Sequence, residues 1–507
     1  MTNKVMMALR FRDCALAAGL IAAFGCQPSE PRPEAPVPPP APPPPPNIVV
    51  IVADDLGYGD IGVYGSQIPT PHIDQLARDG VRLTDGHVSA AVCSPMRAGF
   101  HTGRYQNRFG WEYNPTDHDL GLPLDQRTVA NHFQDAGYAT GLIGKWHLGV
   151  AEPHHPLHRG FDEFYGLLGG ASSYIDSRLP GTHEWPAEGA PTTRTSASRV
   201  IRDGFEVIEV EEYLTDVFAE KAVDFIDRHA DERFLLMLTP NTPHTPLQAT
   251  DEYMERAQHI EGDGARVYAA MVVSLDDYVG DVVAALRKHD LERNTLVVFL
   301  SDNGCINYMP EPICTNAPLA GHKRYHLEGG HRVPFILKWP AGLPQGEVYH
   351  GLASALDLYA TFAAASGFVA DSPDSVDLLP HLRGETSEPP HEFLYWRAAP
   401  NIAIRWGKWK MWKVNNTDIR IPAGPPGQVL PGAAYPPDDS PMGQTTVLYD
   451  LEADIGETSN IADRHPEIVE RLESELAAWE AELSEPMWIN HRGTLHSLHG
   501  QTVQLFF

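Results

Sequence analysis

Two pairs of oxygen-bearing side chains stand directly after apolar runs of the chain. Asp54-Asp55 follows the run 48–53 (IVVIVA), and Asp302-Asn303 follows the run 296–300 (LVVFL). Such runs predict strands buried on both faces, and open α/β sheets place their ligands at the carboxyl ends of these strands. Carboxylate and amide oxygens suit Ca²⁺ or Mg²⁺. Each pair alone fits a capping or turn role equally well; together they favour a metal site.

A cysteine-centred segment is the second feature that could do chemistry. Cys93-Ser94-Pro95-Met96-Arg97 continues into Thr102-Gly103-Arg104. Taken alone, the pentapeptide fits a structural or merely reactive thiol near the start of a helix. Whether this segment has a catalytic function therefore depends on which other side chains lie close to Cys93 in the fold.

Three further segments supply basic side chains. Lys145 and His147 follow a predicted strand at 138–143, where strand alternation places both on one side. His244 lies between two prolines, which limit backbone freedom and hold the histidine in place. Lys323 precedes the segment 328–335 (EGGHRVPF). The alternatives are a solvated lysine, a packed or turn histidine, and a surface lysine.

The elements that must position these residues alternate between helix and strand. Helices are predicted at 71–78, 128–136, 214–229 and 268–286, and strands at 48–53, 138–143, 234–238, 296–300 and 333–338. This order predicts an α/β fold with a large mixed, mostly parallel sheet sandwiched by helices, over residues 47–370.

The texture of the chain changes beyond about residue 370. Short antiparallel strands are predicted at 402–404, 409–414 and 447–449, and an amphipathic helix opens at Pro466. We therefore expect a smaller C-terminal α+β subdomain over 371–507. The Pro/Gly-rich stretch 421–442 predicts a surface loop.

The net charge of the chain restricts the classes of molecule that it can bind. A formal net charge of −29 argues against nucleic acid as a partner, because phosphate binding needs a basic surface. An acidic exterior also repels anionic polymers at long range. An anionic substrate therefore needs a local basic pocket.

The N-terminus predicts an exported protein. Positive residues precede an apolar run at 14–24, which is too short to span a bilayer but suits a signal peptide. The run ends in Ala23-Phe24-Gly25-Cys26, which resembles a bacterial lipobox. We expect a lipoprotein-type signal at 1–26, a Pro-rich linker at 27–46, and a periplasmic or outer-membrane lipoprotein of a Gram-negative bacterium. Its membrane contact would be through the lipid anchor alone. Ordinary cleavage or an uncleaved anchor is the alternative to lipidation.

Two cysteines remain once the signal, the lipobox and Cys93 are set aside. Cys305 and Cys314 lie nine residues apart, and an exported protein meets an oxidising compartment. A disulfide between them is a prediction that the sequence leaves open.

Taken together and in this order, these blocks resemble the formylglycine-dependent (type I) sulfatases of the alkaline phosphatase superfamily. The resemblance covers about residues 47–480 and includes the segments 159–166 (RGFDEFYG) and 448–451 (LYDL). It implies an alkaline-phosphatase-like fold. The chain departs from the family pattern at Met96, where Ser is more frequent, and at Phe100, where Leu is common.

The resemblance implies a role for each block. Cys93 would be oxidised to Cα-formylglycine (3-oxoalanine) by a formylglycine-generating enzyme, and its hydrate would be the nucleophile. Arg97 and His147 would hold the hydrate, and His147 would later remove its second proton. Lys145, His244 and Lys323 would grip the sulfate, with His244 protonating the leaving oxygen. The Ca²⁺ ligands, with Mg²⁺ as the alternative ion, would be Asp54, Asp55, Asp302, Asn303 and the modified Cys93.

The predicted function is hydrolysis of sulfate monoesters. The substrate would be a sulfated carbohydrate, such as fragments of an algal galactan or a glycosaminoglycan. A phosphate or phosphonate ester hydrolase on the same scaffold is one alternative, and an unmatured lipoprotein that binds sulfated glycans is another. Candidate sugar contacts, each with a structural alternative, are Arg104, Asn107, Arg108, Trp111 and His155.

Overall fold

The computed structural model describes residues 44–115, 119–186, 196, 199–306, 309–415, 444–488, 493–499 and 501–506. The predicted signal 1–26, the linker up to residue 43 and the loop 421–442 lie outside these residues. The described residues belong to one compact unit, and the boundary at residue 370 stays a prediction. Among them, no helix has the length and apolar character needed to cross a membrane.

Ten strands of the described chain form one mixed sheet, in the order β13-β2-β12-β11-β1-β9-β4-β5-β7-β8. The five central strands, β11 to β5, are parallel to one another. Antiparallel pairs flank them on both sides. The bounds are β1 Asn47–Ala53, β2 Val81–Leu83, β4 Ala139–Lys145, β5 Glu163–Leu167, β7 Ile201–Asp203, β8 Glu206–Ile208, β9 Phe234–Thr239, β11 Thr295–Ser301, β12 Phe335–Lys338 and β13 Glu347–Tyr349.

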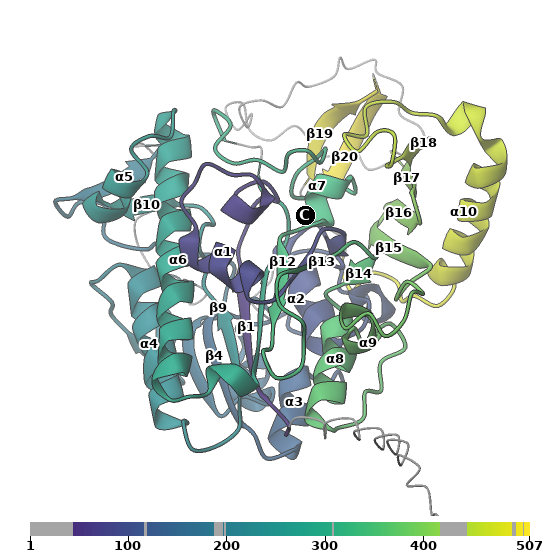
Figure 1. Ribbon diagram of the computed structural model, residues 1–507. Coiled ribbons are helices and arrows are strands. Elements are labelled where there is room, and N and C mark those ends of the chain that lie inside the picture. The colour runs from purple at the N-terminus through teal and green to yellow at the C-terminus, as the bar shows by residue number, and fades with distance from the viewer. Residues whose placement is uncertain are drawn as a thin grey trace, which may run out of the picture. The chain divides into compact units, whose positions relative to one another are not determined.

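Helices bury both faces of this sheet (Figure 1). Along β1, Val49 and Ile51 belong to one apolar core and Ile48 and Val50 to the other, which explains the unbroken apolar run in the sequence. Helices α1, α4 and α6 pack on the first face, and α2, α3 and α8 on the second. The bounds are α1 Pro71–Arg78, α2 Cys93–Thr102, α3 Val129–Asp135, α4 Leu214–Arg228, α5 Asp251–Arg256, α6 Asp263–Lys288, α7 Glu328–His331, α8 Asp357–Ser366, α9 Leu379–Leu382 and α10 Pro466–Glu480.

A separate antiparallel sheet follows in the C-terminal part of the chain. Its order is β15-β16-β17-β18, with bounds Phe393–Ala398, Asn401–Trp406, Trp409–Asn415 and Gln444–Asp450. Helix α10 packs its apolar stripe on one face. The other face carries Trp396 and Trp412 and packs on Leu327, just before α7. The remaining strands pair two by two: β10 Leu247–Thr250 with β6 Thr182–Trp185, β14 Ala353–Ser354 with β3 Gly86–His87, and β19 Gly493–Leu498 with β20 Gln501–Phe506.

The predicted fold class is confirmed: a large, mostly parallel sheet between helices, with a small antiparallel sheet at the C-terminus. The strands β11, β1, β9 and β4 are neighbours in the sheet and parallel, so their carboxyl ends meet at one edge. The predicted site residues that follow these strands are therefore brought together.

Candidate active site

The two oxygen-bearing pairs meet at the ends of β1 and β11. Ala53 and Ser301 are paired residues at the last position of these parallel strands. Beyond them, the Asp55 backbone N–H donates to Asp302 Oδ1 at 3.2 Å, and Asn303 Nδ2 donates to Asp55 Oδ1 at 2.7 Å. Asp55 adopts a left-handed backbone with φ of 66°, which turns the chain at the strand end. Asp54, Asp55, Asp302 and Asn303 are all buried.

Three oxygens of this group are suited to a cation. Asp54 Oδ1, Asp55 Oδ2 and Asn303 Oδ1 are buried and have no hydrogen-bond partner among the described residues. Buried anionic oxygens without a partner are costly. Burial and the charge of Asp54 also raise the pKa of Asp302 to about 6, although Arg97 opposes this shift. The residues present therefore fit a hard divalent cation.

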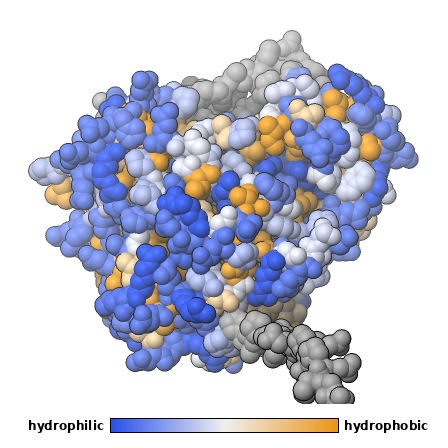
Figure 2. Space-filling model, in the orientation of Figure 1, coloured by the Kyte–Doolittle hydropathy of each residue, from blue (hydrophilic) through white to orange (hydrophobic). Residues whose placement is uncertain are grey.

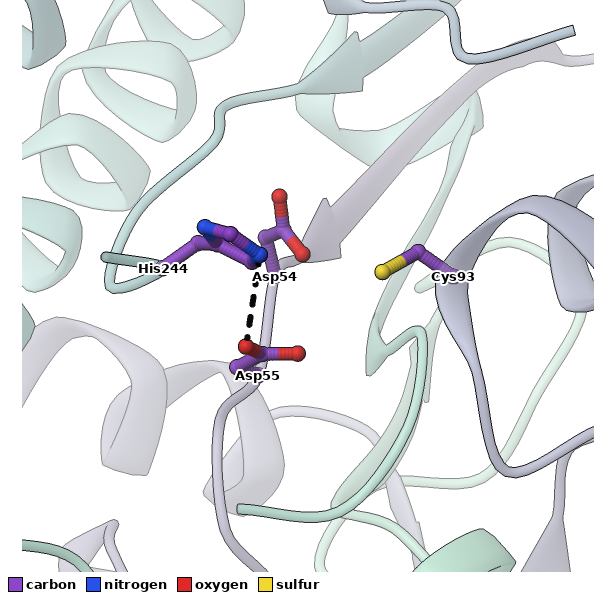
Figure 3. A group of neighbouring side chains, drawn as sticks. All are labelled: Asp54, Asp55, Cys93 and His244. Carbon is purple, nitrogen blue, oxygen red and sulfur yellow. Dashed lines mark ion pairs between the residues drawn. The ribbon is translucent and has the colours of Figure 1, made fainter. Parts of the chain in front are cut away.

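Cys93 is the first residue of α2 and is buried beside these carboxylates (Figure 3). One ligand atom from each of Asp54, Asp55, Cys93 and His244 lies within 4.8 Å of the others. His244 thus lies in the group that could hold a metal, whereas the roles expected for it concerned the sulfate and the leaving oxygen. Although burial opposes the shift, Lys145 and Lys323 lower the pKa of the Cys93 thiol well below its usual value.

Three buried cations face three buried carboxylates. Lys145 Nζ donates to Asp54 Oδ2 at 2.6 Å, and Lys323 Nζ to Asp55 Oδ1 at 2.6 Å. Arg97 Nη2 donates to Asp302 Oδ2 at 2.9 Å. The fixed charges are balanced, so a divalent cation would leave the site positive by about its own charge. With such a cation bound, the site would supply the local positive charge that an anionic ester requires.

The two predicted histidines lie in different electrostatic surroundings. Burial lowers the pKa of His147 to about 4, even though its hydrogen bond with Cys93 opposes the shift. For His244, burial is outweighed by Asp54 and Asp55, which raise the pKa. His244 Nε2 lies 3.6 Å from Asp55 Oδ2, and its Nδ1 lies 2.6 Å from the Thr245 carbonyl oxygen. A neutral His147 suits a general base, and a protonated His244 suits a general acid.

Lys145 and His147 do not reach the site by strand alternation. Lys145 is the last residue of β4, and His147 has a left-handed φ of 61°, so the extended strand has already ended. Both side chains nevertheless lie near Cys93: Lys145 lowers the pKa of its thiol, and His147 is hydrogen-bonded to it. Gly170 leaves room for the His147 ring: a Cβ there would lie 2.7 Å from His147 Nε2. No local pattern in the sequence marks Gly170, because only tertiary packing shows the contact.

Several hydrogen bonds fix the backbone that carries Lys145 and His147. Ser94 Oγ donates to the His147 carbonyl oxygen at 2.7 Å, and Trp111 Nε1 donates to Ser94 Oγ at 2.9 Å. Thr239 Oγ1 donates to the Lys145 carbonyl oxygen at 2.8 Å. Trp111 is fully buried and Arg108 pairs with Asp374 at 2.7 Å, so these two candidate sugar contacts have structural roles.

A disulfide lies next to the loop that carries Lys323. Cys305 and Cys314 are bonded, with Cα atoms 6.0 Å apart, as the sequence allowed. The Lys323 backbone N–H donates to the Cys305 carbonyl oxygen at 2.9 Å. The disulfide therefore constrains the backbone that contacts Lys323. Cys14 and Cys26 lie outside the described residues.

The family model for sulfatases matches residues 46–368. The chain belongs to the sulfatase family, and the protein is a sulfuric ester hydrolase of the alkaline phosphatase-like superfamily.

Relatives of known activity cover most of the chain. It is 32% identical to the steryl-sulfatase of Mus musculus, over 90% of this chain and 84% of the relative. It is 30% identical to the N-acetylgalactosamine-6-sulfatase of Sus scrofa, over 84% of this chain and 83% of the relative. The crystal structure of Ps i-CgsB in complex with k-i-k-neocarrahexaose is 33% identical, covers 88% of this chain and 95% of that chain, and has a TM-score of 0.75.

Proposed function

We propose that this sulfatase cleaves sulfate monoesters with a formylglycine hydrate made from Cys93. The observation that carries the proposal is the position of Cys93: it begins α2 within 4.8 Å of ligand atoms of Asp54, Asp55 and His244. Two buried lysines adjoin the same carboxylates. A merely structural thiol has no need of these partners.

In the proposed reaction, the residues of the chain divide the work. One hydroxyl of the hydrate at position 93, ionised by loss of its proton to solvent, attacks sulfur and breaks the bond between sulfur and the alcohol oxygen, while Lys145 and Lys323 bind the sulfate oxygens. His244 gives its proton to the departing alcohol oxygen. His147 then takes the proton of the second hydroxyl, which releases sulfate and regenerates the aldehyde. A plain hydroxyl or thiol would stop at a stable sulfated enzyme, which the aldehyde avoids.

We propose Ca²⁺ as the bound ion, with Mg²⁺ as the alternative. Asp54, Asp55, Asp302 and Asn303 would hold it: three of these buried residues carry an oxygen without a hydrogen-bond partner in the described part of the chain, and Asp302 accepts from the backbone N–H of Asp55 beside them. Bound there, the ion would polarise the sulfate ester and lower the pKa of the attacking hydroxyl. Chelation should abolish sulfate release and added Ca²⁺ should restore it; full activity after exhaustive chelation would contradict the assignment.

We propose a sulfated carbohydrate as the substrate, met outside the cytoplasm. The likeness to Ps i-CgsB, which was crystallised with a neocarrahexaose, supports a carbohydrate. The likeness to an N-acetylgalactosamine-6-sulfatase points the same way. The proposed export as a lipid-anchored protein rests on the apolar run at 14–24 and on Cys26. Export would bring the enzyme to glycans, and a formylglycine-generating enzyme would have to modify Cys93.

The test is sulfate release from a panel of sulfated mono- and oligosaccharides. The full chain is co-expressed with a formylglycine-generating enzyme, and Cys93→Ala serves as the control. Release by the matured enzyme and none by the control is the expected result. Release that survives in Cys93→Ala would overturn the mechanism. Cleavage of phosphate esters alone would favour phosphate chemistry on this site.

A further inference from the structure

A second buried cluster of charged side chains includes residues of α7 and takes no part in the proposed reaction. We call it the Glu328 cluster. It joins residues of the large-sheet part of the chain with residues of the C-terminal sheet. Its members are Asp85, His87, Glu328, His331, Arg332, Arg405 and Lys410.

Two cations of the C-terminal sheet hold Glu328. Lys410 of β17 donates to Glu328 Oε1 at 2.9 Å, and Arg405 of β16 donates to Oε2 at 2.8 Å. Glu328 and Lys410 are fully buried, and Arg405 nearly so. Removing one member of such a pair leaves an uncompensated charge in the interior. The position of Glu328 is therefore tied to the C-terminal sheet.

The cluster is a closed network rather than a metal site. His87, Glu328 and His331 are close enough to hold an ion. However, Lys410 Nζ lies 2.8 Å from His331 Nε2, and the two Nδ1 atoms of His331 and His87 lie 3.0 Å apart. His87 Nε2 in turn lies 2.9 Å from Asp85 Oδ1. Every ring nitrogen has a partner, and the cations already occupy both Glu328 oxygens.

Helix α7 touches the segments that carry the active site. The Gly304 N–H, directly after Asn303, donates to the Gly330 carbonyl oxygen at 3.1 Å. A Cβ on Gly304 would lie only 1.8 Å from Gly329 oxygen, so the two backbones are in close contact. The Val88 N–H donates to the His331 carbonyl oxygen at 2.8 Å, on the segment that leads to Cys93.

The loop before α7 makes two more such contacts. The Lys323 N–H bonds the Cys305 carbonyl oxygen, and the Arg324 N–H donates to the Ala91 carbonyl oxygen at 2.7 Å. Arg324 holds a left-handed φ of 81°, a strained conformation for a non-glycine residue. A shift of α7 would therefore be transmitted to Lys323, to Asn303 and to the segment before Cys93.

We propose that Lys410 and Arg405 are positioning residues for sulfate ester cleavage: by holding Glu328 they fix α7, and through α7 they place Lys323 and Asn303. The C-terminal sheet would then contribute to catalysis by positioning residues of the active site. The inference rests on the proposed function, because it takes Lys323 and Asn303 to act on the ester. Misplacing reacting groups by about 1 Å can cost about 100-fold in rate.

The test compares Lys410→Met with Lys413→Met in the full, matured chain. Lys413 lies on the same strand but pairs at the surface with Glu473 at 3.0 Å, away from α7. We expect Lys410→Met to lower kcat per formylglycine site about 10-fold or more with KM nearly unchanged, the signature of a lost transition-state interaction. Lys413→Met should stay within about twofold of the parent enzyme. Each variant is assayed at a temperature where circular dichroism shows it folded.

Glu328→Gln removes the charge of the other member of the Lys410–Glu328 pair while keeping the side-chain volume. It therefore tests the inference if Lys410→Met does not fold. A lower melting temperature with parent kcat per matured site would mean a purely structural cluster and would overturn the inference. Lys323→Met is the reference: if it retains both the parent kcat and the parent KM, the role given to Lys323 in the proposed function fails. If it loses activity while Lys410→Met and Glu328→Gln do not, only the present inference fails.

Discussion

At the scale of single residues, the site separates two histidines by their surroundings. His147 is buried against cations, and His244 faces two carboxylates, so their pKa values move in opposite directions. Separate environments of this kind let two groups of one type act as base and acid. The histidines were identified from the sequence, but their difference follows only from the packing.

Gly170 gives a prediction at this scale. Gly170→Ala should lower kcat about 10-fold or more, because its Cβ displaces the ring of the proposed base His147. The displaced atoms end a side chain that can rotate, so the free energy of unfolding should fall by only about 1 kcal/mol or less. Steady-state kinetics and thermal unfolding measure the two effects.

Gly456→Ala is the matched control, since its Cβ would meet nothing closer than 3.5 Å. Parent kcat in Gly170→Ala would show that the ring position of His147 is not critical.

At the scale of elements, the strands of the core could be predicted because both faces are buried. The runs 48–53 and 296–300 are apolar throughout, and the structure extends each by one or two residues as β1 and β11. Strand β15 was not predicted, because its place is set by pairing with β16 rather than by a buried run of its own.

The sequence could place the site at the strand ends but not assemble it. Asn303 bonds Asp55 across 248 positions of the chain, a contact that no local pattern contains. The order of the motifs, through their resemblance to sulfatases, indicated that such residues meet. The Glu328 cluster had no such signal: Lys410 lies in a short strand whose buried face the sequence did not reveal.

The burial of β11 leads to a stability prediction. Leu296 lies at the amino end of β11, far along the strand from Asp302, and is fully buried. Leu296→Ala should lower the free energy of unfolding by about 2–5 kcal/mol, because it leaves a cavity. Leu124→Ala, at a side chain that is 62% exposed, should change it by about 0.5 kcal/mol or less.

Denaturant unfolding measures both Leu variants. Equal, small effects would mean that the two apolar cores do not hold β11 as described.

At the scale of the whole molecule, an acidic chain surrounds a site built for an anion. The net charge is −29, and hydrophilic side chains cover most of the face in Figure 2. Long-range repulsion is screened by salt, whereas contacts inside a buried site are screened much less. The exterior and the site should therefore respond differently to ionic strength.

This difference predicts a salt effect that depends on substrate length. Raising ionic strength from about 0.01 to about 0.15 M shortens the Debye length from about 30 to about 8 Å. The ratio of kcat/KM for a polysulfated chain to that for a monosulfated sugar should rise, since the polymer feels more of the repulsion. Initial rates at a series of salt concentrations give this ratio, and a falling ratio would contradict the predicted repulsion.

The central claim, that residue 93 is the nucleophile toward sulfur, is tested most directly by a trap. In Cys93→Ser, incubated with a sulfate ester that the matured enzyme cleaves, the hydroxyl should attack once and then stop. Peptide mass spectrometry should find one sulfate at position 93 per protein, with no turnover. Sustained turnover by this variant would contradict the account. The absence of a sulfate adduct at position 93, in a folded variant that keeps His147 and His244, would also contradict it.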